Sequence, residues 1–233
     1  KAGAKYREHF QKYPVIYITM KDVKDQQADA FFDKLRQRIA FLFQEHRAVL
    51  ESGVLSEVER RDFQAILDGS GRLSLYEDSL YLLSGFLKRI HRECVILLID
   101  EYDAAIHEAY LHCFAEPVLN FFRRFLGSEL KSNPHLHKAV LTGILRVSKE
   151  SIFSDLNNIS VYSLLRKDYS DVFGFTESEV EAMLEEAGLG DKVNEVRDWY
   201  NGYLFGGRVM YNPWSLLNYM ANGGMVQAYW VNT

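Results

Sequence analysis

An unbroken run of six apolar residues, 94–99, ends abruptly in acidic side chains, and this feature constrains the fold more than any other. Asp100, Glu101 and Asp103 follow the run. Such a run without alternation is typical of a strand buried on both faces, as in a parallel sheet covered by helices. Carboxylates at the end of that strand cost desolvation free energy unless a ligand compensates. The segment therefore predicts an α/β fold that binds a ligand at this edge, where open α/β sheets usually do.

The surrounding sequence alternates strand and helix patterns. Short β-branched runs at 14–20 and 137–143 predict two further strands. Apolar residues at three- and four-residue steps predict helices at about 27–51, 56–67, 74–92 and 116–130, with Ser56 capping the second. This order favours right-handed crossovers and a largely parallel sheet.

The pattern changes after about residue 162. Thr176 and Glu179 have the spacing of a capping box, and Asn212-Pro213 has the form of a cap followed by a first-turn proline. Helices are predicted there, with no convincing strand beyond a short pair at 208–211. We therefore expect two domains, an α/β core at 1–166 and a small helical, lid-like subdomain at 167–233.

Composition limits the class of protein. The 233 residues are 48% hydrophobic and 25% charged, which suits a globular chain, and the formal net charge of −5 comes without a basic stripe for duplex binding. Two cysteines outside any C-x-x-C pair favour a reducing compartment. No apolar run approaches the roughly 20 residues of a membrane helix. We expect a cytoplasmic protein without a membrane partner.

The acidic strand end has the chemistry of a magnesium site. Mg²⁺ prefers hard oxygen ligands, usually one or two carboxylates with several retained waters. Asp100 would hold the metal, and Glu101 would orient or deprotonate a water that attacks a γ-phosphate. The alternative is a buried strand that ends in a solvated acidic turn.

A second candidate site follows the strand predicted at 137–143. Thr142, Gly143 and Arg146 come at its end. The planar guanidinium of arginine suits phosphate, so these side chains would reach the γ-phosphate if the two strands are neighbours. The alternative is a strand-to-helix turn with its bases in water.

Other motifs argue against competing chemistry. No G-x-x-x-x-G-K-[ST] stretch is present, so the loop that holds phosphates in ATPases is missing. His107 and His112 are five residues apart and lie on different faces of a helix, which disfavours a zinc site. No partner strand with a Glu/Asp-x-Lys pattern is apparent beside the acidic segment, as a nuclease would require.

Several blocks in order resemble the bacterial AAA-ATPase-like family, P-loop proteins often followed by a domain similar to PD-(D/E)xK nucleases. The resemblance covers nearly the whole chain. The blocks are residues 13–17, 95–103, 141–154, 156–158, 173–177, 199–203, 211–218 and 229–233.

The resemblance implies a P-loop NTPase-like fold of AAA+/STAND type, a three-layer parallel sheet truncated at the N-terminus. Asp100 would be the Walker B magnesium residue, with Asp103 beside the nucleotide. Glu101 would be the catalytic carboxylate, and Thr142 and Arg146 would belong to the sensor strand and its turn. The phosphate loop and its strand would lie upstream of Lys1, and the nuclease-like domain downstream of Thr233.

The expected function is therefore that of an ATP-binding and hydrolysing fragment with Mg²⁺ and ATP as cofactors, inactive by itself. A missing strand would expose a sheet edge and favour self-association. Nucleic acid would be a partner only through the downstream domain, and the protein partner is not encoded in any motif. The alternative is a non-catalytic protein-interaction module with a degenerate or structural nucleotide site.

Overall fold

The computed structural model describes residues 4–144 and 159–232, and the chain divides into two compact units, 1–158 and 159–233. This division falls eight residues before the boundary expected from the sequence. In the first unit, strands and helices alternate. The elements are α1 (Ala4–Arg7), β1 (Val15–Thr19), α2 (Ala28–Glu45), η1 (Arg47–Glu51), α3 (Glu57–Leu67), α4 (Leu73–Glu77), α5 (Ser79–His91), β2 (Val95–Asp100), α6 (Tyr102–Leu111), α7 (Ala115–Leu130) and β3 (Leu136–Leu141).

The sheet of the first unit is parallel, in the order β1-β2-β3. Tyr17 pairs with Leu98, and Leu98 pairs with Val140, so β2 lies in the middle. The predicted α/β class with a parallel sheet is confirmed. Because the three strands run in one direction, their carboxyl ends meet at a single edge.

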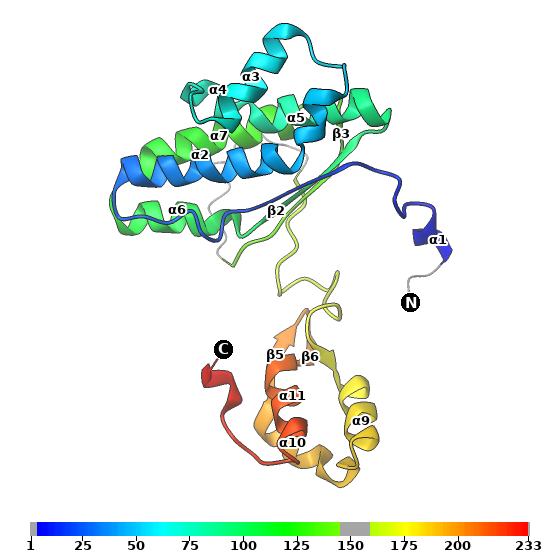
Figure 1. The fold of residues 1–233 in the computed structure, drawn as a ribbon. Coiled ribbons are helices and arrows are strands. Elements are labelled where there is room, and N and C mark those ends of the chain that lie inside the picture. The colour runs from blue at the N-terminus through cyan, green and yellow to red at the C-terminus, as the bar shows by residue number, and fades with distance from the viewer. Residues whose placement is uncertain (1–3, 145–158, 233) are drawn as a thin grey trace. The chain divides into compact units, whose positions relative to one another are not determined.

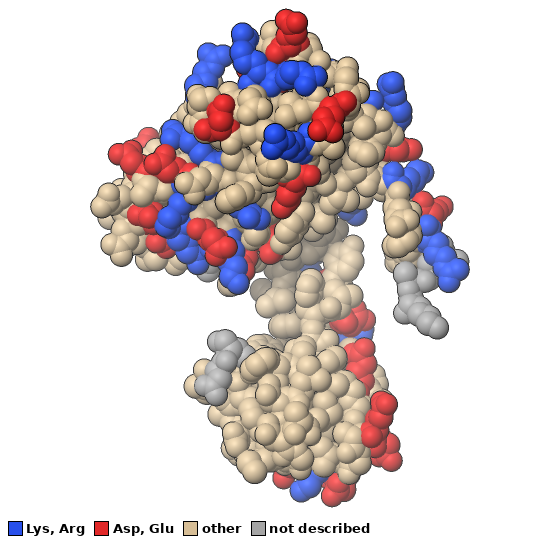
Figure 2. All heavy atoms as spheres, in the orientation of Figure 1, with Lys and Arg blue, Asp and Glu red and all other residues tan. Residues whose placement is uncertain are grey.

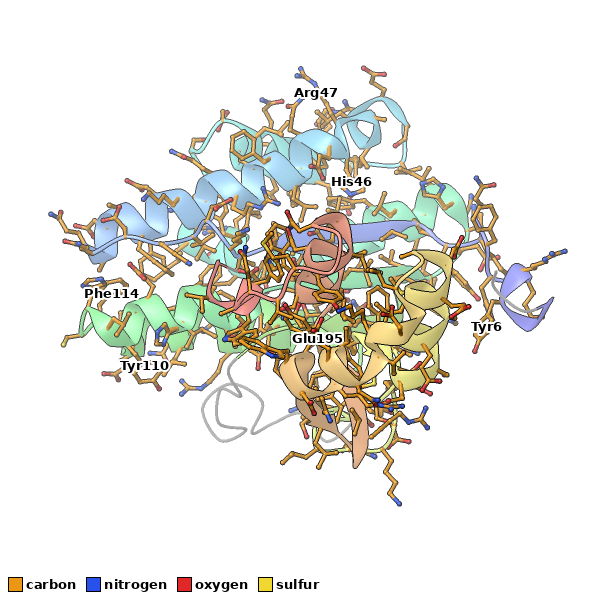
Figure 3. All side chains as sticks on the ribbon, turned by 90° about the horizontal axis from the view of Figure 1, so that it is seen from below. Tyr6, His46, Arg47, Tyr110, Phe114 and Glu195 are labelled. Carbon is orange, nitrogen blue, oxygen red and sulfur yellow. The ribbon has the colours of Figure 1, made fainter. Side chains whose placement is uncertain are left out.

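The helices α2, α3, α4, α5 and α7 gather on one side of this sheet (Figure 1). Their apolar faces form the core; in α2, for example, Phe31, Leu35 and Ile39 are buried. Phe114, between α6 and α7, meets Phe31 edge-on at 5.4 Å between ring centroids and lies near the start of α2 (Figure 3). Ser56 caps α3 through a capping box with Glu59, as predicted.

The opposite face of the sheet is open among the described residues. In β2, burial alternates: Val95, Leu97 and Ile99 are buried, and the intervening side chains are partly exposed. Tyr17 and Val140, which flank β2 on that open face, are exposed. The prediction that β2 is buried on both faces is therefore wrong for the described part of the chain. An apolar run shows that a strand is hydrophobic, but it does not supply the second layer of helices.

The second unit combines helices with a small antiparallel sheet. Its elements are β4 (Phe175–Thr176), α9 (Glu177–Glu186), η2 (Gly190–Lys192), α10 (Val193–Tyr200), β5 (Asn201–Phe205), β6 (Arg208–Tyr211), α11 (Pro213–Ala221) and η3 (Tyr229–Asn232), with strand order β4-β6-β5. Thr176 caps α9 in a capping box, and Asn212 caps α11 with Pro213 in its first turn, as predicted.

The prediction of a helical unit with at most a short strand pair at 208–211 is incomplete: β6 lies at those residues, but β4 and β5 were not predicted. Gly206 and Gly207 connect β5 to β6 with φ values of 56° and 85°. Two positive φ angles suit the tight turn of a two-residue hairpin, and glycine adopts them without a Cβ penalty. Aromatic and β-branched residues on both sides of Gly-Gly were the available signal.

A carboxyl group is sealed in the core of the first unit. Glu129 is fully buried on α7, where its Oε2 accepts hydrogen bonds from Ser84 Oγ at 3.1 Å and Asn133 Nδ2 at 2.9 Å. Its Oε1 has no partner among the described residues. Burial raises the pKa of Glu129 from 4.5 to about 8. The group is therefore protonated at neutral pH.

Among the described residues, no helix combines the length and the apolar character that a membrane crossing requires.

We predict that Glu129→Gln removes a pH dependence of stability. The folded state keeps the Glu129 proton up to about pH 8, whereas an ordinary glutamic acid loses it near 4.5. Between about pH 4.5 and pH 8 the folded state therefore binds more protons than the unfolded state. The contribution of Glu129 to the free energy of unfolding falls as the pH rises through this window. Above pH 8 the variant should be more stable than the parent by about 1–3 kcal/mol.

Urea unfolding at pH values on both sides of this window measures the effect. Glu116→Gln, at an exposed position of the same helix, is the matched control. Its free energy of unfolding should change with pH as that of the unsubstituted protein does. Equal slopes for the parent and Glu129→Gln would show that the buried carboxyl does not titrate in this window.

Candidate functional site

Two of the residues expected to form a site meet at the carboxyl edge of the parallel sheet. Asp100 is the last residue of β2, and Thr142 comes directly after β3. The Thr142 hydroxyl donates a hydrogen bond to Asp100 Oδ1 at 2.5 Å. This bond ties the acidic strand end to the neighbouring strand and fixes the direction of the carboxylate.

Backbone hydrogen bonds fix the turn that follows β2. Thr142 N–H donates to the Ile99 carbonyl at 2.9 Å, and Tyr102 N–H donates to the Thr142 carbonyl at 3.1 Å. Between them, Glu101 has φ 50° and ψ 43°, a left-handed conformation that costs free energy for a residue with a Cβ. Its N–H lies 3.4 Å from Thr142 Oγ1. The turn therefore starts α6 immediately after the strand and places Glu101 at its N-cap.

Asp103 lies deeper than the other two acids. It belongs to the first turn of α6, where a negative charge suits the helix dipole, and only 4% of it is exposed. A Cβ built on Gly143 would come 2.5 Å from Asp103 Oδ1. The turn after β3 thus packs its backbone against this carboxylate. The expected contact of Asp103 with a nucleotide stays a prediction.

Thr19 is a residue of this edge that the sequence reasoning missed. It pairs with Asp100 in the register of β1 and β2, so hydroxyl groups flank Asp100 on both neighbouring strands. Its Oγ1 accepts a hydrogen bond from Lys21 N–H at 3.3 Å. The signal was available, because Thr19 stands at the end of a strand that the sequence predicted.

The donor set fits magnesium better than a fully protein-bound metal. No group of three or more His, Cys, Asp or Glu residues capable of holding a metal occurs in the described ranges. Asp100, Thr19 and Thr142 offer hard oxygen atoms at one edge, and Mg²⁺ usually takes one or two carboxylates and keeps several waters. Arg146, predicted for the γ-phosphate, lies outside the described residues and remains a prediction.

We predict that Gly143→Ala distorts this edge. The added methyl group would collide with the buried Asp103 carboxylate, which must move. We expect a loss of about 1–3 kcal/mol in the free energy of unfolding, the usual cost of overpacking.

Gly127→Ala is the matched control, since a Cβ at this position in α7 meets nothing within 4 Å. It should stabilise the protein by about 0.5–1 kcal/mol through helix propensity. Thermal or urea unfolding compares the two variants. An unchanged stability for Gly143→Ala would mean that Asp103 is not confined as the structure shows.

Comparison with known proteins supports one family. The family model described as "Predicted AAA-ATPase" matches residues 2–153. A protein of Azotobacter chroococcum mcd 1, described as "Uncharacterized protein in vnfD 5'region", is 36% identical over 126 residues. The match covers 54% of this chain and 24% of that protein, so this chain spans a minor part of its relative. No solved structure matches significantly. Since the family model covers well over half of the sequence, the chain belongs to the predicted AAA-ATPase family.

Proposed function

We propose that this chain carries the magnesium-and-water half of an ATP site and takes part in ATP hydrolysis within a longer protein. The observation that carries the proposal is the Asp100 carboxylate, held by Thr142 at the carboxyl edge of a parallel sheet, with Glu101 directly after it. That edge is the usual ligand site of open α/β sheets. Membership of the predicted AAA-ATPase family supports the same chemistry.

Each residue has a distinct proposed role. Asp100, the Walker B residue in this proposal, would hold Mg²⁺ directly or through water, and the Thr142 hydroxyl keeps its carboxylate in place. Bound magnesium would neutralise charge on the phosphates. Glu101 orients the attacking water and accepts its proton. Arg146 would contact the γ-phosphate from the turn after the sensor strand β3.

The proposed site needs a phosphate-binding loop from outside these 233 residues, because no G-x-x-x-x-G-K-[ST] stretch is present in them. In the described part of the chain, β3 pairs with β2 alone and offers its outer edge to a further strand. The Azotobacter relative is also much longer than the matched segment. We therefore propose a P-loop NTPase fold of AAA+/STAND type for the intact protein, with a strand added beside β3.

The environment of the protein is also a proposal. Cys94 and Cys113 are free thiols. This state suits the reducing cytoplasm that the cysteine spacing favours.

We predict that Glu101→Gln separates nucleotide binding from turnover. The amide keeps the size of the side chain but cannot accept a proton, so Mg-ATP affinity should change less than about twofold while turnover falls about 10²–10⁴-fold. Phosphate release and calorimetry, on a chain that includes the phosphate-binding loop, measure the two quantities.

Glu108→Gln on the same helix is the matched control. Glu108 Oε1 lies 3.4 Å from Nε2 of His112, the C-cap of α6, whereas Glu101 is the N-cap at the other end of the helix, so substitution of Glu108 should leave both quantities unchanged. Unchanged turnover in Glu101→Gln would rule out the proposed role of Glu101.

A non-catalytic interaction module is the second candidate, favoured by the missing phosphate loop. It predicts that Mg-ATP raises the melting temperature of the unsubstituted chain that includes the phosphate-binding loop. Neither that chain nor its Glu101→Gln variant would then release phosphate. Measurable phosphate release by the unsubstituted longer chain would exclude the non-catalytic module.

A further inference from the structure

An aromatic pocket in the second unit belongs to neither proposed function. Its volume is about 270 Å³, and it lies between α10, the start of α11 and η3. The side chains that line it carry no formal charge. They include Trp199, Tyr200, Tyr203, Asn212, Ser215 and Trp230.

The aromatic walls of this pocket are fixed by contacts within the unit. Trp199 and Trp230 lie 6.4 Å apart between ring centroids, and Tyr200 meets Trp230 edge-on at 6.0 Å. The Tyr200 hydroxyl donates to the Gln227 carbonyl at 2.8 Å and accepts from Gln227 N–H at 3.2 Å. The segment before η3 is thereby tied to α10. The rings form a preformed wall, which lowers the entropic cost of binding.

Ser215 is the second observation that indicates a ligand. Only 1% of this residue is exposed, and its hydroxyl is buried without a hydrogen-bond partner in the described part of the chain. A buried, unsatisfied hydroxyl costs about 1–3 kcal/mol, and such groups are few in native proteins. Since Ser215 lines the pocket, a bound polar group would supply the missing partner.

Charge favours a cation as that group. Residues 159–233 contain ten Asp and Glu against five Lys and Arg, whereas residues 1–158 contain 22 of each class. The whole net charge of −5 therefore belongs to the second unit. The acidic side chains gather along α9, and the face over α10 and α11 is largely uncharged (Figure 2). The negative faces of tryptophan and tyrosine rings attract a cation, and the acidic unit repels phosphates.

One nearby carboxylate already has a partner. Glu195 on α10, labelled in Figure 3, accepts a hydrogen bond from the Tyr219 hydroxyl at 2.6 Å and does not line the pocket. The attraction for a cation must therefore come from the ring faces and from the field of the whole unit. A site of this kind distinguishes a cation from a neutral group of the same shape.

The size of the pocket and its rim indicate the source of the cation. Pockets for small-molecule ligands are usually about 300–1,000 Å³, so this one suits a single side chain. Exposed apolar residues continue on the same unit at Trp214, Leu217 and Met225. Tryptophan and methionine are enriched where proteins bind one another. We propose that the pocket binds an arginine or lysine side chain presented by a partner protein.

Titration with small probes tests this proposal on the whole chain. The probes are a Gly-Ser-rich peptide with one arginine, the same peptide with citrulline, and tetramethylammonium ion. The indole N–H signals of the three tryptophans report binding by NMR. We expect the arginine peptide to shift Trp199 and Trp230 but not Trp214, and to bind more tightly than the other two probes. If the citrulline peptide binds as tightly as the arginine peptide, the pocket does not select a cation. If tetramethylammonium binds more tightly than the arginine peptide, the pocket does not select a side chain of a partner protein.

Three tryptophan variants and one serine variant give the matched comparison. Trp199→Leu and Trp230→Leu should weaken binding of the arginine peptide about 2- to 30-fold, the range of single cation–π contacts. Trp214→Leu, an exposed control outside the pocket, should not. Ser215→Ala should weaken binding about 2- to 10-fold and leave the melting temperature unchanged or higher, because the hydroxyl has no partner to lose. Unchanged binding in the pocket variants would overturn the proposal.

Discussion

The hydrogen bond between Thr142 and Asp100 is the interaction on which the proposed site depends. It exists because β2 and β3 run parallel and in register, so that residues far apart in sequence end at one edge. The same pairing places the Thr142 backbone where it holds the left-handed turn at Glu101. A carboxylate that was free to rotate would pay side-chain entropy whenever it bound a metal, and this bond removes part of that cost.

The sequence predicted the parts of the fold that depend on local patterns. Apolar spacing located α2, α3, α5 and α7 of the first unit but not α1 or α6, and the capping residues Ser56, Thr176 and Asn212 marked true helix starts. It also predicted which strand ends would carry polar groups, and Asp100 and Thr142 do meet. Local propensity and tertiary structure agree at these positions, which is why single-sequence reasoning was sufficient there.

Other features depend on information that lies outside a local window. Burial of β2 on both faces requires a second layer of helices, and no pattern in residues 94–99 shows whether that layer is present. The partner of the strand predicted at 208–211 was missed because β5 is short and directly follows α10. Thr19 was missed because a threonine at a strand end becomes informative only when the strand order is known.

The two units present different kinds of surface for binding. The edge of the parallel sheet offers oxygen ligands and suits a metal with phosphates. The aromatic pocket offers ring faces within an acidic unit and suits a cation. The carboxylate edge disfavours phosphates until magnesium neutralises it, and the aromatic pocket has no charged group that would hold an anion. The chain therefore combines a nucleotide-type edge with a protein-binding pocket in our account.

Calorimetric titration with Mg-ATP distinguishes half of an ATP site from a structural strand end. It should compare this 233-residue chain with a longer chain that includes the proposed phosphate-binding loop. The account predicts that only the longer chain binds Mg-ATP and that Asp100→Asn in that chain weakens binding when magnesium is present. If the longer chain does not bind Mg-ATP, the acidic strand end is not half of an ATP site. The same conclusion follows if Asp100→Asn leaves the affinity of the longer chain for ATP unchanged in the presence of magnesium.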